Sequence, residues 1–319
     1  MYRFTFLVLL IFNLSYSQKK MKIPPYLKKG DIVAIVCTAR KFFLEDAIPA
    51  KELLESWGLK IKLGATIGLD SCQLGGTDLE RAADFQNMMD DENIKAIWCS
   101  RGGYGTVRMV DLLDFTKFKK NPKWIMGFSD VTVLHSQANA ERVASLHCIM
   151  PFTVPKASDE VKETLRRALF GEHIEYSIPS KSYDIQGKTS GELVGGNLSI
   201  LYSLLGSKSS LDTKNKILYI EDLDEYLYHI DRMMQNIKRN GYFENLNGLI
   251  VGGMTDMHDN EIPFGQNAVQ IITAIAKEYN IPVCFDFPAG HMKDNRTLVL
   301  GKEVDFEVNE KEVVLKFKD

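Results

Sequence analysis

Residues 124–131 read Trp124-Ile125-Met126-Gly127-Phe128-Ser129-Asp130-Val131, an apolar run that ends on a small Gly-Phe-Ser-Asp turn. The apolar pattern resumes after the turn at helical spacing. A serine on a tight strand-to-helix turn has its hydroxyl pushed outward, where the next backbone N–H and the helix N-terminus can stabilise negative charge. The turn therefore predicts that Ser129 is a nucleophile. A Ser-Asp pair is also a common helix N-cap, so the local pattern alone leaves both interpretations open.

The segments on either side of this turn alternate between strand-like and helical patterns. Buried strands that alternate with helices predict a parallel sheet covered on both faces, with ligands bound beyond the carboxyl ends of the strands. Ser129 lies at such an end. The expected strands span 32–37, 59–63, 94–100 and 123–128, and the expected helices span 47–57, 78–90, 106–113 and 131–139.

A second domain is expected after residue 190. Pro151 and Pro155 break the alternation, and a charged helix over 159–170 and a polar stretch follow. Asn197 is a candidate N-cap for a helix over 198–205. We place the first domain at 21–155, a linker at 156–190 and a smaller α/β domain at 191–319. The other elements expected in this domain are strands at 216–220, 248–252 and 282–286, helices at 228–239 and 268–279, and a terminal pair near 297–300 and 313–317.

Two of these later strands lead to residues that suit a nucleophilic serine. Glu221 follows the strand at 216–220, and His291 follows the strand at 282–286. A hydrolytic serine needs a base to take its proton and an acid to orient that base. The order Ser, Glu, His along the chain occurs in the catalytic triads of α/β-hydrolases. The Gly-x-Ser-x-Gly elbow of those enzymes is absent, because Val131 occupies the position of its second glycine. Ser129, Glu221 and His291 are therefore the predicted catalytic residues.

A glycine-rich turn at 100–106 is the second feature that could handle an anion. Its pattern matches neither Gly-x-Gly-x-x-Gly nor the lysine-containing phosphate loop, and a simple tight turn is the alternative. We expect an N–H of Gly102 or Gly103 to join the N–H of Asp130 in an oxyanion hole. Arg101 is a candidate for the terminal carboxylate of the substrate, because arginine suits planar anions. Tyr104 is the other candidate substrate-binding residue.

The composition argues against several function classes. The 319 residues are 45% hydrophobic and 25% charged, which is typical of a globular protein, and the net charge of −3 comes without a basic block, so nucleic acid is not an expected partner. The five cysteines lie mostly in apolar runs and are interpreted as core residues. No pair of histidines has metal-ligand spacing, so neither a metal nor another cofactor is expected.

The remaining histidines are interpreted by their positions. His135 and His229 lie on expected helices and are interpreted as structural. His147 lies close enough to the linker to border the site without being the base. His173 and His258 have polar neighbours and are interpreted as surface residues. His291 is thus the predicted base.

The first residues resemble a secretory signal peptide. Arg3 precedes an apolar run at 4–12 that is too short to span a bilayer, and small residues lie at Ser15 and Ser17. We expect a signal peptide over 1–17, cleavage after Ser17 and a periplasmic or secreted protein without a stable membrane anchor. If Met21 is instead the start, the protein would be cytoplasmic.

The motifs together resemble the LD-carboxypeptidase family, the muramoyl-tetrapeptide carboxypeptidases. This serine peptidase family also contains the microcin C immunity hydrolases. The resemblance runs from about residue 23 to 317. It is carried by residues 101–105, 127–130, 191–197, 221–222 with 230–232, and 290–291 with 295–301.

The resemblance implies both a fold and an activity. It implies an amidotransferase-like, flavodoxin-like N-terminal domain joined to a swivelling α/β C-terminal domain, usually as a homodimer. Ser129 matches the nucleophile, and Glu221 and His291 match the other triad members. Family members remove the terminal D-Ala from the L,D-linked murein tetrapeptide during peptidoglycan recycling or remodelling.

Two departures and two alternatives remain open at this stage. The chain has His147-Cys148-Ile149-Met150-Pro151 where family members often carry His-Gly-Pro, and the family is usually cytosolic. The alternatives are an amidase that acts on an acyl-sulfamoyl adenylate and a non-catalytic murein-binding protein. A class I glutamine amidotransferase would need a cysteine at position 129. The sequence leaves open which diamino acid the wall peptide carries and whether the substrate is a free muropeptide or the intact wall.

Overall fold

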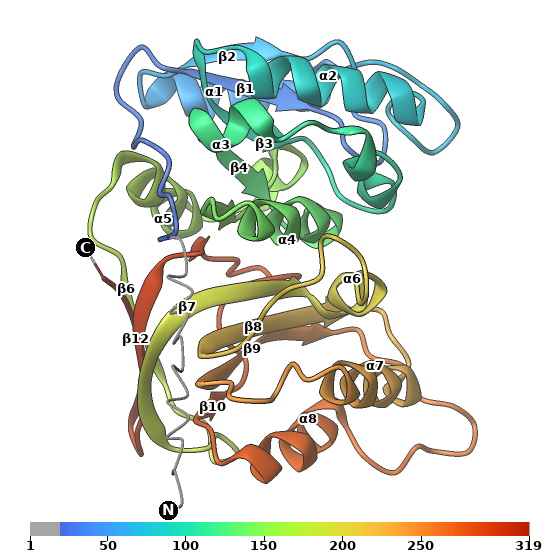
Figure 1. Ribbon diagram of the computed structural model, residues 1–319, viewed down its shortest axis with the longest axis vertical. Helices are drawn as coiled ribbons and strands as arrows, with labels where there is room; N and C mark the ends of the chain where they lie inside the picture. The colour runs from blue at the N-terminus through green and yellow to red at the C-terminus, as the bar shows by residue number, and fades with distance from the viewer. Residues whose placement is uncertain (1–19, 319) are drawn as a thin grey trace, which may run out of the picture.

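The computed structural model describes residues 20–318, in which two sheets lie one above the other along the long axis of the molecule (Figure 1). The signal peptide predicted at 1–17 lies outside these residues. The upper layer in Figure 1 carries the N-terminal half of the chain, and the lower layer carries the C-terminal half.

The first sheet has the strand order β11-β5-β4-β3-β1-β2. Strands β1 to β5 run parallel, and only β11 is antiparallel to its neighbour. This arrangement confirms the predicted parallel α/β fold. The bounds are β1 Ile32–Val36, β2 Lys60–Leu63, β3 Ile94–Cys99, β4 Trp124–Gly127, β5 Ser145–His147 and β11 Leu298–Leu300.

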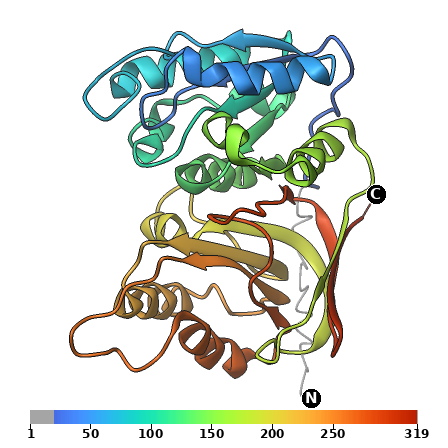
Figure 2. The same ribbon diagram turned by 180° about the vertical axis from the view of Figure 1, so that it is seen from behind.

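Helices cover both faces of this sheet, as alternating strands and helices require. On one face α1 and α5 share a buried apolar cluster with Val33 and Ile35 of β1, and on the other α2 and α4 share one with Ala34 and Val36. Figure 1 shows α2 in front of the sheet, and the reverse view in Figure 2 shows α1 in front. The bounds are α1 Ile48–Ser56, α2 Asp78–Asp90, α3 Thr116–Lys120, α4 Thr132–Ala140 and α5 Asp159–Phe170.

The prediction of a helix at 106–113 is wrong. The chain forms two short 3-10 turns there, Thr106–Arg108 and Val110–Leu112. The backbone N–H of Thr106 donates to the buried carboxylate of Asp130 at 2.8 Å, which fixes the start of the segment against the turn that carries Ser129. Three β-branched residues among the first five positions also weaken its helix propensity.

The second sheet has the strand order β10-β9-β8-β7-β12-β13-β6. Strands β7 to β10 run parallel, and β12, β13 and β6 add an antiparallel extension. The strands are β6 Glu175–Pro179, β7 Gly187–Asn197, β8 Lys216–Leu223, β9 Gly248–Thr255, β10 Val283–Cys284, β12 Glu303–Val308 and β13 Glu312–Phe317, and the helices are α6 Leu198–Ser203, α7 Leu227–Arg239 and α8 Ala268–Ala276. These three helices pack on one face of the sheet.

Both strands expected at 297–300 and 313–317 form, as β11 and β13, but they do not pair with each other. β11 leaves the second domain and pairs with β5 of the first sheet, whereas β13 pairs with β12 and β6. The burial patterns explain the difference. All three residues of β11 are buried, as suits a strand inside an α/β fold, whereas buried and exposed residues alternate along β12 and β13.

The two layers share one apolar core. Trp124 and Leu146 of the first sheet belong to the same buried cluster as Tyr219 and Ile250 of the second, together with Leu298 of β11. Because this surface is buried between the layers, each layer depends on the other for part of its hydrophobic stabilisation.

A buried charge cluster also joins the two layers. Glu192 of β7 accepts from the Asn139 side chain at 2.8 Å and pairs with Arg142 at 3.1 Å, both from the end of α4 and the turn after it. Lys216 of β8 pairs with the same carboxylate at 3.1 Å and is almost fully buried. A buried carboxylate with three polar partners is costly to disturb, because removing its charge leaves the buried cation uncompensated.

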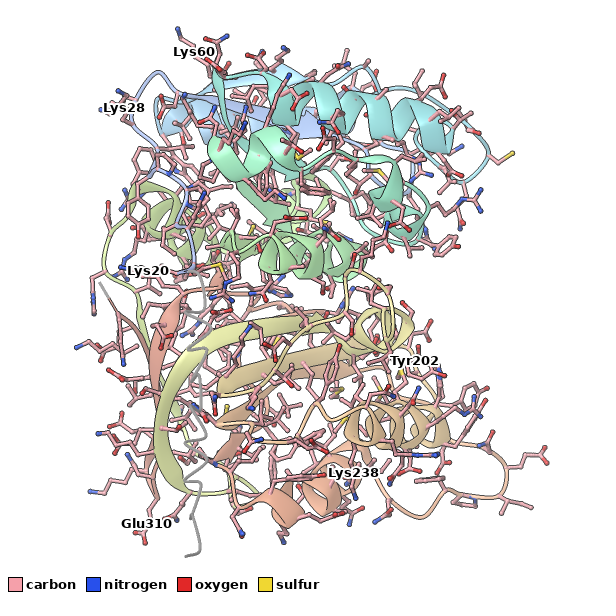
Figure 3. The ribbon with its side chains drawn as sticks, viewed as in Figure 1. Lys20, Lys28, Lys60, Tyr202, Lys238 and Glu310 are labelled. Carbon is pink, nitrogen blue, oxygen red and sulfur yellow. The ribbon has the colours of Figure 1, made fainter. Side chains whose placement is uncertain are left out.

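We therefore expect Glu192→Gln to lower the free energy of unfolding by about 3 kcal/mol. Equilibrium unfolding in urea measures this change. The matched control is Glu310→Gln, which removes the same charge from the exposed β12–β13 turn at the far end of the second layer (Figure 3). A loss below about 0.5 kcal/mol, the usual range for surface substitutions, would contradict the assigned role of the cluster.

Candidate active site

Ser129 lies on a strained turn between β4 and α4. It has a φ of 63°, in the left-handed region that non-glycine residues rarely adopt. An N-cap residue usually has extended backbone angles, and neither the 3-10 turn Ser129–Val131 nor α4 has a side-chain cap. The geometry thus favours the interpretation of Ser129 as an outward-facing residue on an elbow over its interpretation as a helix cap.

Glu221 and His291 are directly hydrogen-bonded. The Nδ1 atom of His291 lies 2.7 Å from Oε2 of Glu221, and the backbone N–H of His291 donates to the same oxygen at 3.1 Å. The Glu221 side chain is fully buried, because β8 extends to Leu223 rather than ending at 220 as expected. The hydrogen bond at Nδ1 leaves Nε2 as the ring nitrogen that can exchange a proton with a substrate or nucleophile.

The loop that carries His291 is fixed on several sides. Gly290 has a φ of +98°, and a Cβ atom there would lie 2.6 Å from Oε2 of Glu221, so a larger residue would displace the carboxylate. The N–H of Gly290 donates to the Asn295 side chain at 2.8 Å, and the Thr255 hydroxyl donates to the carbonyl of His291 at 2.9 Å. The imidazole is therefore held in one place before any substrate binds.

The environment of His291 favours its charged form. Burial by itself lowers the pKa of His291, but the charge and hydrogen bond of Glu221, together with the charge of Asp222, outweigh this effect and raise the pKa above its usual 6.5. Asp222 lies next to Glu221 in β8, and burial together with the charge of Glu221 raises its pKa to about 7. The Glu221 carboxylate thus raises the pKa of both of its neighbours, His291 and Asp222.

Ser129 and His291 line the same cleft, which has a volume of about 540 Å³. Phe128, the residue before Ser129, contacts the imidazole of His291, with the two ring centroids 4.8 Å apart. The cleft lies between the two domains, since Ser129 follows β4 of the first sheet and His291 follows β10 of the second. The structure thus brings the three residues predicted from separate strands to one place.

The glycine-rich turn borders this cleft at Ser129. A Cβ atom on Gly102 would lie 3.1 Å from the Ser129 hydroxyl oxygen, and Gly103 also lines the cleft. The turn is fixed to the elbow because Asp130 accepts the N–H of Thr106. Burial raises the pKa of Asp130. The oxyanion-hole role of Gly102, Gly103 and the Asp130 N–H remains a prediction.

The two predicted substrate-binding residues lie in different places. Arg101 lines the cleft, where its guanidinium stacks 4.0 Å from the ring centroid of Phe152. Tyr104 is half exposed and is not among the residues that line the cleft, and its role in substrate binding remains a prediction.

The walls of the cleft have opposite charges. Arg40 and Arg101 line the first-domain side, whereas Asp222, Asp224 and Glu225 line the second-domain side. Sequence reasoning missed Arg40, although it follows β1 at the edge of the sheet where ligands bind. It also assigned no role to the acidic residues after Glu221. Such an arrangement orients a substrate that carries charge at one end.

The other histidines and the cysteines form no metal centre within residues 20–318. His135 bonds Ser145 and the Gly127 carbonyl, each at 2.9 Å, and His147 is buried against Phe128 and Tyr219. Four of the cysteines are buried, and Cys72 is exposed. Within the same residues no cluster of His, Cys, Asp or Glu could hold a metal ion, and no helix has the length and apolar character to cross a membrane.

Comparisons with known proteins show which family models, relatives and solved structures the chain is similar to. The family model of the LD-carboxypeptidase N-terminal domain matches residues 33–148, and that of the LD-carboxypeptidase C-terminal domain matches residues 190–306. A probable murein peptide carboxypeptidase of Bacillus subtilis is 32% identical over 317 residues, covering 96% of each chain. A murein tetrapeptide carboxypeptidase of Pseudomonas aeruginosa is 27% identical, covering 87% of this chain and 93% of the relative. The crystal structure of a muramoyltetrapeptide carboxypeptidase from Oxalobacter formigenes has the same fold, with a TM-score of 0.82 at 24% identity over 90% of this chain and 99% of that one.

The Glu221–His291 pair predicts a specific change in titration. In the wild type the pKa of His291 should lie above 6.5, and Glu221→Gln should lower it, because burial then acts without the opposing carboxylate charge. NMR titration of the histidine Cε1–H resonances, assigned with His291→Gln, measures both values. An unchanged or higher pKa in Glu221→Gln would contradict the assigned electrostatics.

Proposed function

Since the chain belongs to the LD-carboxypeptidase family, we propose that it is a serine peptidase that removes the terminal D-Ala from L,D-linked murein tetrapeptides. The single observation that carries the proposal is the buried Glu221–His291 pair, which shares one cleft with the strained Ser129. The names of the relatives supply the substrate class, and the charged walls of the cleft suit a peptide that carries a free carboxylate.

The proposed reaction is acyl transfer through a covalent intermediate. His291, oriented by Glu221, takes the proton of the Ser129 hydroxyl as its oxygen attacks the carbonyl carbon that precedes D-Ala. The same imidazole then gives this proton to the departing amine of D-Ala. Water, deprotonated by His291, hydrolyses the acyl-enzyme and restores the Ser129 hydroxyl.

Stabilisation of the tetrahedral intermediate is proposed to come from backbone donors. The Asp130 N–H follows the nucleophile directly, as in other nucleophile elbows, and the turn at Gly102 lies close to the Ser129 oxygen. Asp130 supports this arrangement with its side chain, because its carboxylate anchors the segment after the glycine-rich turn. Arg101 is proposed to face the terminal carboxylate of the substrate.

The alternatives differ in what they require of the cleft. An amidase for acyl-sulfamoyl adenylates needs an aromatic side chain on which the adenine ring can stack. In this cleft Phe128 already packs on His291 and Phe152 already stacks with Arg101, so neither ring is free for adenine. A non-catalytic murein-binding protein would not need a buried acid to orient His291. Hydrolysis rates on the murein tetrapeptide and on aspartyl sulfamoyl adenosine test the first alternative, which requires cleavage of the second compound. Reaction of Ser129 with a fluorophosphonate probe tests the second alternative, because a non-catalytic binding protein would not react.

Export and assembly are further proposals. We propose that residues 1–17 are removed on secretion, so that the substrate is wall peptide outside the cytoplasm, and that the mature protein is a homodimer. N-terminal sequencing of the protein from its native host tests the first statement, since a chain beginning at Met21 would contradict it. Sedimentation equilibrium tests the second.

The nucleophile gives the most direct test of the proposed reaction. We expect Ser129→Ala to lower kcat for D-Ala release from the L,D-tetrapeptide by about 10³-fold or more, because the covalent pathway is lost. Mass spectrometry of the tri- and tetrapeptides measures the release. The melting temperature should stay close to that of the wild type.

The matched control for this substitution is Ser56→Ala, at the exposed end of α1. It removes the same hydroxyl away from the cleft and should leave kcat unchanged. Wild-type rates in Ser129→Ala would refute the assignment of the nucleophile.

A further inference from the structure

Arg40 is a cleft residue to which the proposed reaction assigns no role. It follows the carboxyl end of β1, next to the strand end that carries Arg101, and its backbone forms a bridge with Leu74. Its side chain passes directly beneath the glycine-rich turn. A Cβ atom on Gly103 would lie 2.5 Å from Nε of Arg40, so only glycine at 103 leaves room for the guanidinium stem.

The charge of Arg40 has no partner within residues 20–318. Its Nε is buried and makes no hydrogen bond, and no carboxylate oxygen of the described residues lies within 4.0 Å of the side-chain nitrogens of Arg40 or Arg101. A buried N–H of a cation without an acceptor is unfavourable, and such groups are usually satisfied by a ligand or water. Burial and the like charge of Arg40 lower the pKa of Arg101, and the charge of Asp46 only partly opposes them. Two guanidinium groups without a direct ion pair therefore lie on the same wall as Ser129.

The opposite wall restricts where an anion can bind. Asp222, Asp224 and Glu225 line the second-domain side of the cleft. Asp224 is bonded to His258 and Glu225 to His229, each at 2.5 Å. A carboxylate is therefore attracted to the arginine side rather than to this side. A peptide that enters the cleft therefore has one favourable position for a carboxylate, and this position lies on the domain that carries the nucleophile.

We propose that Arg40, together with Arg101, binds the C-terminal carboxylate of the substrate and so restricts cleavage to the last residue of the peptide. The inference rests on the proposed function and adds a determinant of its specificity. Guanidinium groups match carboxylates through paired, charge-assisted hydrogen bonds. A peptide with a C-terminal amide or an additional residue cannot place a carboxylate at this position, and it leaves both cations unpaired.

The test compares two substrates, the L,D-tetrapeptide with a free D-Ala carboxylate and the same peptide with a D-alanine amide. The wild type should prefer the free acid by about 10²-fold or more in kcat/KM, because a site built for a charged group rejects an analogue that lacks it. Arg40→Gln should raise KM for the acid by about 10-fold or more and change kcat/KM for the amide by less than about 3-fold, so the preference should fall. Arg40→Lys keeps the charge without the planar fork and should retain part of the preference.

The matched control is Arg239→Gln, which removes the same charge from the exposed end of α7 and should keep the wild-type preference. If Arg40→Gln lowered kcat/KM equally for the acid and the amide, Arg40 would only support the glycine-rich turn. That result would overturn the inference. A wild type that cleaves acid and amide equally well would also overturn it while leaving the proposed function intact. A wild type that cleaves neither peptide, and so releases neither D-Ala nor D-alanine amide, would contradict both proposals.

Discussion

The pairing of β11 with β5 is the constraint on which the candidate site depends. β11 directly follows the loop that carries His291, and it pairs antiparallel with β5 of the first sheet, with Leu298 opposite His147. β5 in turn pairs with β4, with His147 opposite Gly127, two residues before Ser129. Two ladders of backbone hydrogen bonds therefore hold the loop of His291 near the turn of Ser129, although the two residues belong to different domains and lie 162 positions apart in the chain.

The remaining contacts between the layers strengthen this arrangement. The shared apolar core limits separation of the sheets, and the cluster around Glu192 adds a directional contact between α4, β7 and β8. The hydroxyl of Thr132, in the first turn of α4, accepts the N–H of Asn197 at 3.0 Å, and the Asn197 side chain donates to Asp222 and Glu221. The acid that orients His291 is thus linked through Asn197 to the helix that follows the nucleophile.

The sequence predicted the parts of the fold that depend on local pattern. The apolar runs of the first sheet and the helical pattern at 78–90 identify their elements within a few residues, and the strand ends indicated Ser129, Glu221 and His291 as residues that could meet. The position of β11 was not predictable, because its partner lies about 150 positions away and a short apolar run carries no sign of which sheet it joins. The end of β8 was misjudged because Glu221 and Asp222 interrupt the apolar pattern, although their buried partners keep them in the strand. The sequence around Arg40 gave no indication that this residue lines the cleft, because its position depends on Gly103 and its proposed role on the opposite wall.

The central claim is that a nucleophile of one domain is activated by a base and an acid of the other. Its most direct measurement is the rate at which a fluorophosphonate probe labels the protein, with the modified peptide identified by mass spectrometry, in the wild type, His291→Ala and Glu221→Gln. The account predicts labelling of Ser129 alone, with a rate that falls by about 10²-fold or more when either partner is replaced. Labelling at another residue, or labelling of Ser129 at the wild-type rate in His291→Ala, would contradict it.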